Sequence, residues 1–229
     1  TAYEIMPSLV GSEMCIRDSS CREFSSYCLG VIFKPSSTLE RIAEEAPLSY
    51  SFTALLLFGL LYSLAALIWY LKGISVSWAW VTIIPVREYY LWEALFMVPV
   101  CVQVYVLSAA LAHLFSRLQH GKGSFESTLA VFGFAYIPLI ISFWLPDMVL
   151  NLLFGIETLL ALVPFYATIS GLWSILLSGL GLKMSQQIPL PRAFLTASVS
   201  IALGNTLTPV SYTHLRAHET RHDLVCRLL

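Results

Sequence analysis

Charged residues are scarce in this sequence. Asp, Glu, Lys and Arg together make up 12% of the 229 residues, while hydrophobic residues make up 57%. Soluble domains average about 25% charged and about 45–50% apolar residues. The formal net charge is −1, so there is no basic excess of the kind that favours nucleic-acid binding. The composition argues against a soluble domain and predicts a membrane protein.

The sequence also lacks the short motifs of common catalytic and metal-binding sites. It contains neither a His-Glu-x-x-His helix nor a Gly-x-Ser-x-Gly turn. Gly-Lys-Gly-Ser at 121–124 does not have the spacing of a phosphate-binding loop. The cysteines away from the chain ends, Cys21, Cys28 and Cys101, show neither metal-ligand spacing nor a disulfide framework. We therefore expect no enzyme, no cofactor and no metal.

Both ends of the chain resemble sequencing-adapter DNA read as protein. The codons GAG ATG TGT ATA AGA GAC AGN encode Glu13 to Ser19, and their reverse complement encodes Pro209 to Leu215. One short DNA element, read forwards at one end and backwards at the other, accounts for both segments. The alternative is a genuine polar tail at each end.

We therefore expect residues 1–19 and 209–229 to be adapter-derived, and such segments are excluded before a fold is considered. This removes three histidines, His214, His218 and His222, which recur every fourth residue and would otherwise suggest a metal-binding helix face. The remaining insert is formally neutral and is expected to be truncated at both ends.

Long uncharged runs dominate the remaining sequence. Runs of about twenty apolar residues cross a hydrocarbon core about 30 Å thick. Lipid admits only helices and closed barrels, and these runs lack the alternation of barrel strands. We predict an all-α, polytopic transmembrane helical bundle of about five spans. The predicted spans are 52–71, 94–115, 125–145, 159–182 and a truncated 193–208.

The stretch Met148–Glu157 leaves five or six spans open. It is too short to cross and is typical of an interfacial segment. A sixth span from Met148 to Phe165 would place Glu157 at membrane depth, at a cost of roughly 2.5–3.5 kcal/mol. Cytoplasmic loops collect positive residues, and with a cytoplasmic N-terminus five spans separate them better than six. The inner residues are then Arg22, Lys34, Arg41, Arg117, Lys122, Lys183 and Arg192, and the outer ones Lys72 and Arg87.

A short amphipathic helix is predicted in the cytoplasmic segment 20–50. Ser37 and Glu40 have the spacing of a capping box. Leu39 and Ile42 then fall on one face. We expect this helix to lie on the inner leaflet, with docking of a cytosolic partner as the alternative.

Small residues recur at helical spacing in the fourth predicted span. Ser170, Ser174 and Ser178 are four residues apart, a pattern that lets helix backbones approach closely. We favour packing within the bundle, and a dimer face is the alternative.

The most distinctive segment precedes the third span. Gly121 and Gly123 predict a flexible turn. Ser124 suits an N-cap position, and Phe125 then begins the helix. Pro138 lies inside the span, where it removes one backbone hydrogen bond and predicts a kink.

This pattern resembles the Yip-domain family of Ypt/Rab-interacting membrane proteins, and its compact form is similar to prokaryotic members. The resemblance covers about 35–208 and implies a five-span transmembrane domain at 51–208 with a cytoplasmic N-terminus. Eukaryotic members are associated with vesicle trafficking and Rab-type GTPases. The matching features are the lead-in at Pro35–Ile42, Gly121 to Phe125, Tyr136-x-Pro138, and Trp173 to Leu182.

We predict an integral membrane scaffold or adaptor in membrane organisation or trafficking. Expected partners are the lipid bilayer, itself or other membrane proteins, and a small GTPase for a eukaryotic-type member. The membrane is the plasma membrane in a prokaryote, and the Golgi or endoplasmic reticulum in a eukaryote. The alternative is a small-solute transporter or channel component, because ionisable residues near the spans (Glu93, His113 and Glu157) are functional candidates.

Overall fold

The chain forms a bundle of helices, and the residues that the structure describes contain no strand. This confirms the predicted all-α class. The computed structural model describes residues 21–74, 84–154 and 156–227, with side chains up to Thr208 apart from residues 156 and 157. After a helix at residues 21–33, the elements are α2 (Pro35–Glu45), α3 (Leu48–Leu71), α4 (Tyr89–Leu118), α5 (Phe125–Phe134), α6 (Ile137–Leu139), the π-helical η1 (Ile140–Trp144), α7 (Leu145–Leu153), α8 (Ile156–Gln186) and α9 (Leu190–Arg227).

Four segments of the described chain are long and apolar enough to cross a membrane. They overlap the first four predicted spans and are longer at one or both ends, and the exact spans stay predictions. The fifth predicted span, 193–208, lies in α9, which is not among the four, so it stays a prediction. The four segments are Leu48–Leu71, Tyr89–Leu118, Phe125–Leu153 and Thr158–Gln186.

The ambiguous stretch Met148–Glu157 is divided between two spans. α7 ends at Leu153 and α8 begins at Ile156. No single helix of the described residues therefore covers the alternative sixth span from Met148 to Phe165. Met148–Leu153 complete the third apolar segment, and the fourth begins at Thr158, directly after the stretch. The choice between five and six spans stays a prediction. The side chain of Glu157 lies outside the described residues.

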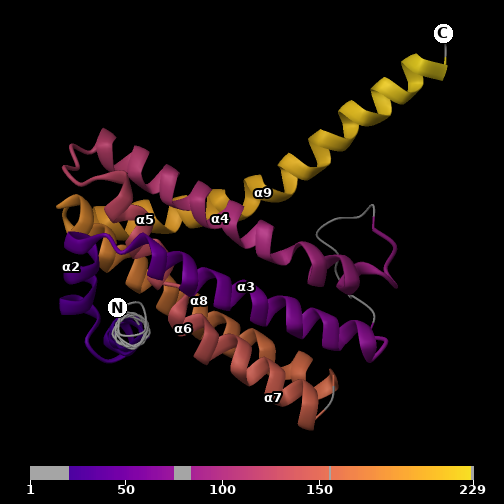
Figure 1. Cartoon of the computed structure of the whole chain (residues 1–229), viewed down its shortest axis with the longest axis horizontal. Helices are drawn as coiled ribbons and strands as arrows, with labels where there is room; N and C mark the ends of the chain where they lie inside the picture. The colour runs from indigo at the N-terminus through magenta and orange to yellow at the C-terminus, as the bar shows by residue number, and fades with distance from the viewer. Residues whose placement is uncertain (1–20, 75–83, 155, 228–229) are drawn as a thin grey trace, which may run out of the picture.

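α5 lies at the centre of the bundle, in contact with α2, α3, α4 and α8. Every residue from Ser127 to Ala135 is buried. The Phe134 ring lies 5.4 Å from the ring of Tyr27 in the helix at residues 21–33. Figure 1 shows α2 and the α8–α9 connection at one end of the bundle and α7 at the opposite end. α5, the first part of the third span, is therefore enclosed by protein, whereas Leu145 and Leu153 in its last part are exposed.

Glycines allow the neighbouring helices to approach α5. A Cβ atom on Gly133 would lie 2.6 Å from Ser51 Cβ, and one on Gly181 would lie 1.9 Å from Val131 Cγ1. Ser51 Oγ also donates a hydrogen bond to the Ala130 carbonyl, at 3.0 Å. Since helices gain little from hydrophobic burial inside lipid, such close packing and interhelical hydrogen bonds hold the bundle together.

Pro138 marks an interruption of the third span. α5 ends at Phe134, and a turn precedes α6 and the π-helical η1. Pro138 has no amide hydrogen to donate to the Phe134 carbonyl, so the α-helical ladder cannot continue unbroken. Ser142 Oγ donates to the Pro138 carbonyl at 2.8 Å. The interruption agrees with the predicted kink.

α2 is the predicted short helix, but its start and its surroundings differ from the prediction. Lys34 is the N-cap, and no side chain caps the helix. The predicted capping box at Ser37 is wrong because Pro35, with its fixed φ, starts the helix two residues earlier. Leu39 and Ile42 are fully buried in the core, and α2 packs on α5 and α8. The predicted position on the inner leaflet is therefore also wrong.

Candidate functional site

The loop between α4 and α5 begins with a tight helix ending. His120 has a φ of 64°. The Gly121 amide donates to the Ser116 carbonyl at 2.8 Å, and the His120 amide donates to the Arg117 carbonyl at 3.1 Å. This is the hydrogen-bond pattern of a Schellman motif, with histidine at the left-handed position that glycine usually occupies.

Gly121 and Gly123 are required by close packing and not by turn flexibility. A Cβ atom on Gly121 would lie 2.8 Å from the Ser116 carbonyl oxygen, and one on Gly123 would lie 1.7 Å from the Ser185 carbonyl oxygen. The loop therefore lies directly against the end of α8. The predicted flexible turn is corrected accordingly, since neither glycine has the positive φ that His120 has.

Gln186, the last residue of α8, connects three elements through one fully buried side chain. Its Nε2 lies 2.6 Å from Thr128 Oγ1, 3.1 Å from the Ser124 carbonyl oxygen and 3.2 Å from His113 Nδ1. Its own carbonyl accepts from the Lys122 amide at 3.0 Å. We call His113, Ser124, Thr128 and Gln186 the Gln186 junction, and this end of the bundle the junction end. The sequence analysis missed Gln186, because a polar residue at a span end carries no distinctive pattern.

Ser124 is the N-cap of α5, as predicted. Its Oγ accepts from the Ser127 amide at 3.1 Å. Ser127 Oγ in turn donates to the Ala43 carbonyl of α2 at 2.6 Å. Phe125 begins α5, and its ring lies 5.7 Å from the His113 ring. The start of the third span thereby holds α2 and α4 in place.

The other two residues of the predicted motif lie deeper in the bundle. The Tyr136 ring lies 4.9 Å from Phe58 and 6.3 Å from Tyr105, and Pro138 is buried. They do not reach the Gln186 junction, so the motif serves helix packing at two levels of one span.

The serines of the fourth span are mostly enclosed. Ser170 and Ser178 are each 1% exposed, and Ser174 is half-buried. Ser170 Oγ donates to the Tyr166 carbonyl within α8 at 2.6 Å. This burial favours packing within the bundle over a dimer face, and both stay predictions.

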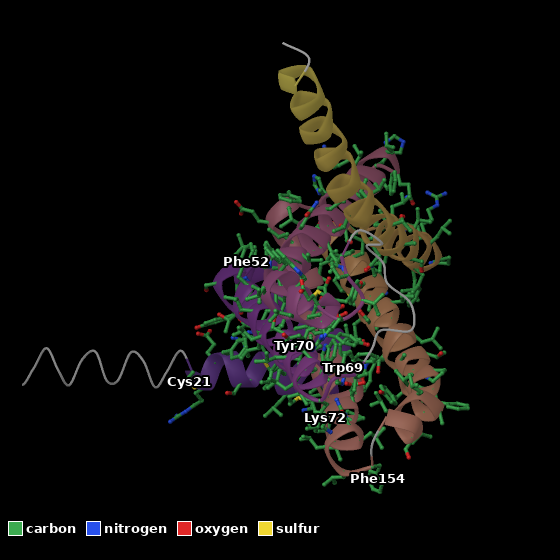
Figure 2. The ribbon with its side chains drawn as sticks, turned by 90° about the vertical axis from the view of Figure 1, so that its right-hand side faces the viewer. Cys21, Phe52, Trp69, Tyr70, Lys72 and Phe154 are labelled. Carbon is green, nitrogen blue, oxygen red and sulfur yellow. The ribbon has the colours of Figure 1, made fainter. Side chains whose placement is uncertain are left out.

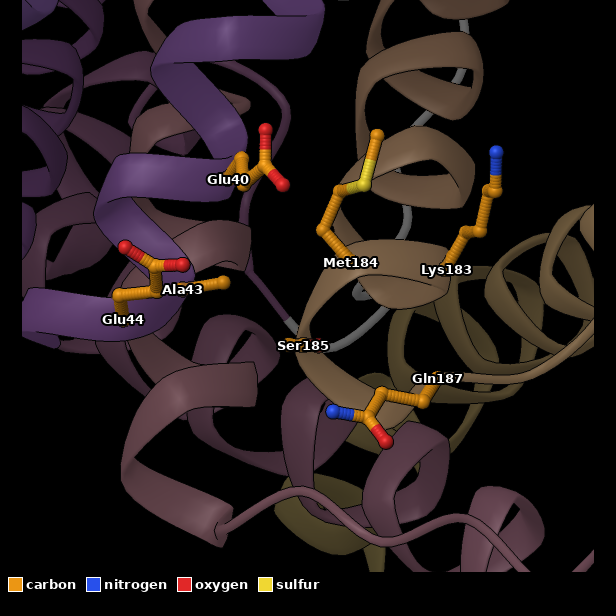
Figure 3. Close-up of a pocket in the computed structure, with 7 residues that line it drawn as sticks. All are labelled: Glu40, Ala43, Glu44, Lys183, Met184, Ser185 and Gln187. Atoms are coloured by element: carbon orange, nitrogen blue, oxygen red, sulfur yellow. The ribbon is translucent and has the colours of Figure 1, made fainter.

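An open groove of about 330 Å³ lies beside the junction, between α2 and the end of α8. Figure 3 shows the Glu40 and Glu44 carboxylates on the α2 wall, with Lys183 and Met184 across from them. The groove is therefore polar and carries both signs of charge. The remaining lining residues are Ala43, Ser185 and Gln187.

A polar network outside the spans fastens residues 21–33 to α2. The Tyr27 hydroxyl and Arg41 Nε both donate to the Glu45 carboxylate, the latter at 2.7 Å. The Arg41 guanidinium lies 4.5 Å from the centre of the Tyr27 ring. Hydrogen bonds from Arg41 and Tyr27 lower the pKa of Glu45. Burial, together with the hydrogen bond to Glu45, raises the pKa of Tyr27 to about 12.

The end of the bundle opposite the junction also holds buried polar groups. Asp147 in α7 is 1% exposed and accepts a hydrogen bond from the Tyr166 hydroxyl at 2.7 Å. Lys72 Nζ donates to the carbonyl and to Oδ1 of Asn151, the latter at 3.1 Å. Figure 2 shows Lys72 beside Trp69 at the end of α3. The sequence analysis missed Asp147, because an apolar run continues on both sides of it.

The candidate residues for transport are separated. His113 belongs to the Gln186 junction, whereas Glu93 Oε1 accepts from the Tyr62 hydroxyl at 2.8 Å, between α4 and α3. In the part of the chain whose side chains are described, no three His, Cys, Asp or Glu residues gather closely enough to hold a metal ion. His214, His218 and His222 lie outside that part.

Comparison with known proteins identifies one family. The Yip1 domain matches residues 29–209, a range that includes the junction and every described span. No curated protein and no solved structure matches the chain. The predicted adapter segments lie outside the matched range except for Pro209, and their origin stays a prediction. The match and the apolar helices agree with the resemblance in the sequence and make this an integral membrane protein. The chain belongs to the Yip1 domain family.

Proposed function

We propose that this chain is an integral membrane scaffold or adaptor that acts in membrane organisation or trafficking without catalysis. The observation that carries the proposal is the Gln186 junction. It fastens the end of α8 to α5, and Ser127 in the first turn of α5 donates to the Ala43 carbonyl of α2. The groove between α2 and α8 stays open at the surface. A rigid groove at the end of a span is suited to capture a partner, because little side-chain freedom is lost on binding.

The chemistry of the groove indicates what kind of partner fits. Glu40 and Glu44 on the groove wall suit a basic segment of a partner. Lys183 in the same groove suits an acidic group next to that basic segment. Opposite charges across an interface give specificity and orientation more than raw affinity. We propose a polar segment of another membrane protein or of a cytosolic protein as the partner. For a eukaryotic-type member, a small GTPase belongs to this class.

The membrane and the orientation belong to the same proposal. The junction end faces the cytoplasm, because the loops at that end carry most of the Lys and Arg residues. The host membrane is the plasma membrane in a prokaryote, and the Golgi or endoplasmic reticulum in a eukaryote.

Photo-crosslinking from the groove tests this function. A photoreactive phenylalanine at Gln187 is expected to give one adduct of defined mass in native membranes. Phe165 is the control, because it is 68% exposed in α8, well away from the groove at the end of that helix. Reversing the charges of Glu40 and Glu44 to Lys should remove the Gln187 adduct. Identical adduct patterns from Gln187 and Phe165 would contradict a docking groove.

One observation favours the transporter alternative. Asp147 is a carboxyl group buried inside a span, and such residues are functional candidates by default. The test is proton entry into proteoliposomes that contain a pH-sensitive dye. A flux that Asp147→Asn abolishes and Gly171→Ala leaves intact would establish transport, because an added Cβ at Gly171 meets nothing within 4 Å. No flux above empty vesicles would leave the scaffold as the function.

A further inference from the structure

Three cationic side chains stand exposed at the junction end. Arg117 lies at the end of α4, Lys122 in the following loop, and Arg192 in the first turn of α9. Gln119 Nε2 donates to Thr196 Oγ1 at 2.8 Å and so holds the end of α4 against the start of α9. We call Arg117, Lys122 and Arg192 the cationic seam.

The loop between α4 and α5 is attached close to the start of α9. The Lys122 amide donates to the carbonyl of Gln186, four residues before α9 begins. Arg117 Nη1 donates to the Gly121 carbonyl at 2.9 Å, which leaves most of its five N–H groups free for an external acceptor. The seam is therefore built on fixed backbone.

Acidic residues are rare around the seam. Between Ala94 and Pro146 the sequence contains a single acidic residue, Glu126, and between Thr158 and Thr208 it contains none. The ion pairs between described side chains all involve Arg41, which bonds to Glu23 and Glu45. The seam therefore keeps a local excess of positive charge, and apart from Glu126 the acids of the junction end lie on residues 21–45.

Exposed leucines adjoin the seam. Leu114 and Leu118 in α4 and Leu195 in α9 are each more than half exposed. Leu118 and Leu195 immediately neighbour the hydrogen-bonded pair Gln119 and Thr196. Cations bordered by an exposed apolar surface at the end of a span fit a ligand with an anionic head and an apolar tail.

We propose that the cationic seam binds the headgroup of an anionic phospholipid, with its acyl chains along Leu114, Leu118 and Leu195. The arginine guanidinium matches the geometry of a phosphate group and can donate two parallel hydrogen bonds, while Lys122 contributes a point charge. A lipid bound there connects α4, the loop and α9. The site requires no partner protein, so the proposal of a lipid site does not depend on the proposal of a docking groove.

Electron paramagnetic resonance of spin-labelled lipids tests the site. The full chain is reconstituted into mixed vesicles of phosphatidylcholine and phosphatidylserine, and motional restriction of each labelled lipid is measured. Labelled phosphatidylserine should associate more strongly than labelled phosphatidylcholine. The Lys122→Gln/Arg192→Gln double variant should reduce this preference by about fivefold for each cation removed.

Three controls make the result specific. Lys183→Gln removes a cation that faces the groove, and it should leave the lipid preference unchanged. Lys122→Arg/Arg192→Lys keeps both charges and should retain the preference, which separates charge from a folding defect. Added inorganic phosphate should not displace the labelled lipid. Equal restriction of both lipids, or an unchanged preference in the double Gln variant, would overturn the proposal.

Discussion

Gly123 occupies a position in which no side chain fits. A Cβ atom there would lie 1.7 Å from the Ser185 carbonyl oxygen, which belongs to backbone and cannot turn away. Overpacking at such sites typically costs about 1–3 kcal/mol. We predict that Gly123→Ala lowers the unfolding temperature of the detergent-solubilised protein, measured by circular dichroism.

Gly171 provides the matched control for this substitution. It lies inside α8, and an added Cβ atom would meet nothing within 4 Å. Gly171→Ala should therefore be neutral or stabilising by up to about 1 kcal/mol. Equal losses of stability in the two variants would show that the contact with Ser185 does not matter.

His120 is the opposite case, a residue with a side chain at a position where the backbone conformation favours glycine. Its φ of 64° is unfavourable for a residue with a Cβ atom. We predict that His120→Gly stabilises the protein by about 1 kcal/mol, because relief of this strain exceeds the added freedom of the unfolded chain. Gly73, with a φ of 67° in open space, supplies the reverse test. Gly73→Ala should destabilise, and thermal unfolding of both variants checks the pair.

At the scale of elements, attachment of the helix at residues 21–33 depends on pH through Glu45. The pKa of Glu45 is lowered from its ordinary 4.5 in the folded protein by Arg41 and Tyr27. A lowered pKa stabilises above the ordinary value, and this contribution is lost as the pH falls through the folded value. We predict that hydrogen exchange in residues 21–33 accelerates below about pH 4.5 relative to α5.

The variant Glu45→Gln isolates this effect. It should exchange faster in residues 21–33 at neutral pH and lose the acid-dependent step. Because Glu45 is half exposed, the change should be confined to this helix and leave the bundle folded. An acid step of undiminished size in Glu45→Gln would assign the pH dependence to another group.

Helices were easier to predict from this sequence than their surroundings. Uncharged runs located α3, α4 and α8 because lipid requires long apolar helices. The prediction that lipid covers the apolar face of α2 was wrong, because an amphipathic pattern does not reveal whether lipid or protein covers the apolar face. Gln186 and Asp147 could not be predicted, since their importance lies in partners far away in sequence, Thr128 and Tyr166 respectively.

At the scale of the whole molecule, the chain ends carry a separate prediction. The last part of α9 projects away from the other helices (Figure 1). We predict that a chain ending at Thr208 keeps the thermal stability of the bundle, because the removed backbone does not pack on it.

Sequencing the locus from source DNA checks the adapter origin independently. Reads that reproduce residues 209–229 would contradict it and make His214, His218 and His222 a metal-binding candidate.

The central position of α5 has a consequence for how the protein is made. Two residues of α8 that pack on α5, Gly181 and Gln186, lie about fifty residues later in the sequence. During synthesis the third span is therefore made before α8, which is one of the four helices that contact α5. Until then Thr128 Oγ1 lacks the Gln186 amide and keeps only its hydrogen bond to the Ser124 carbonyl within the same helix. The packing around α5 is therefore completed only after α8 has been inserted, although α2, α3 and α4 are made before it.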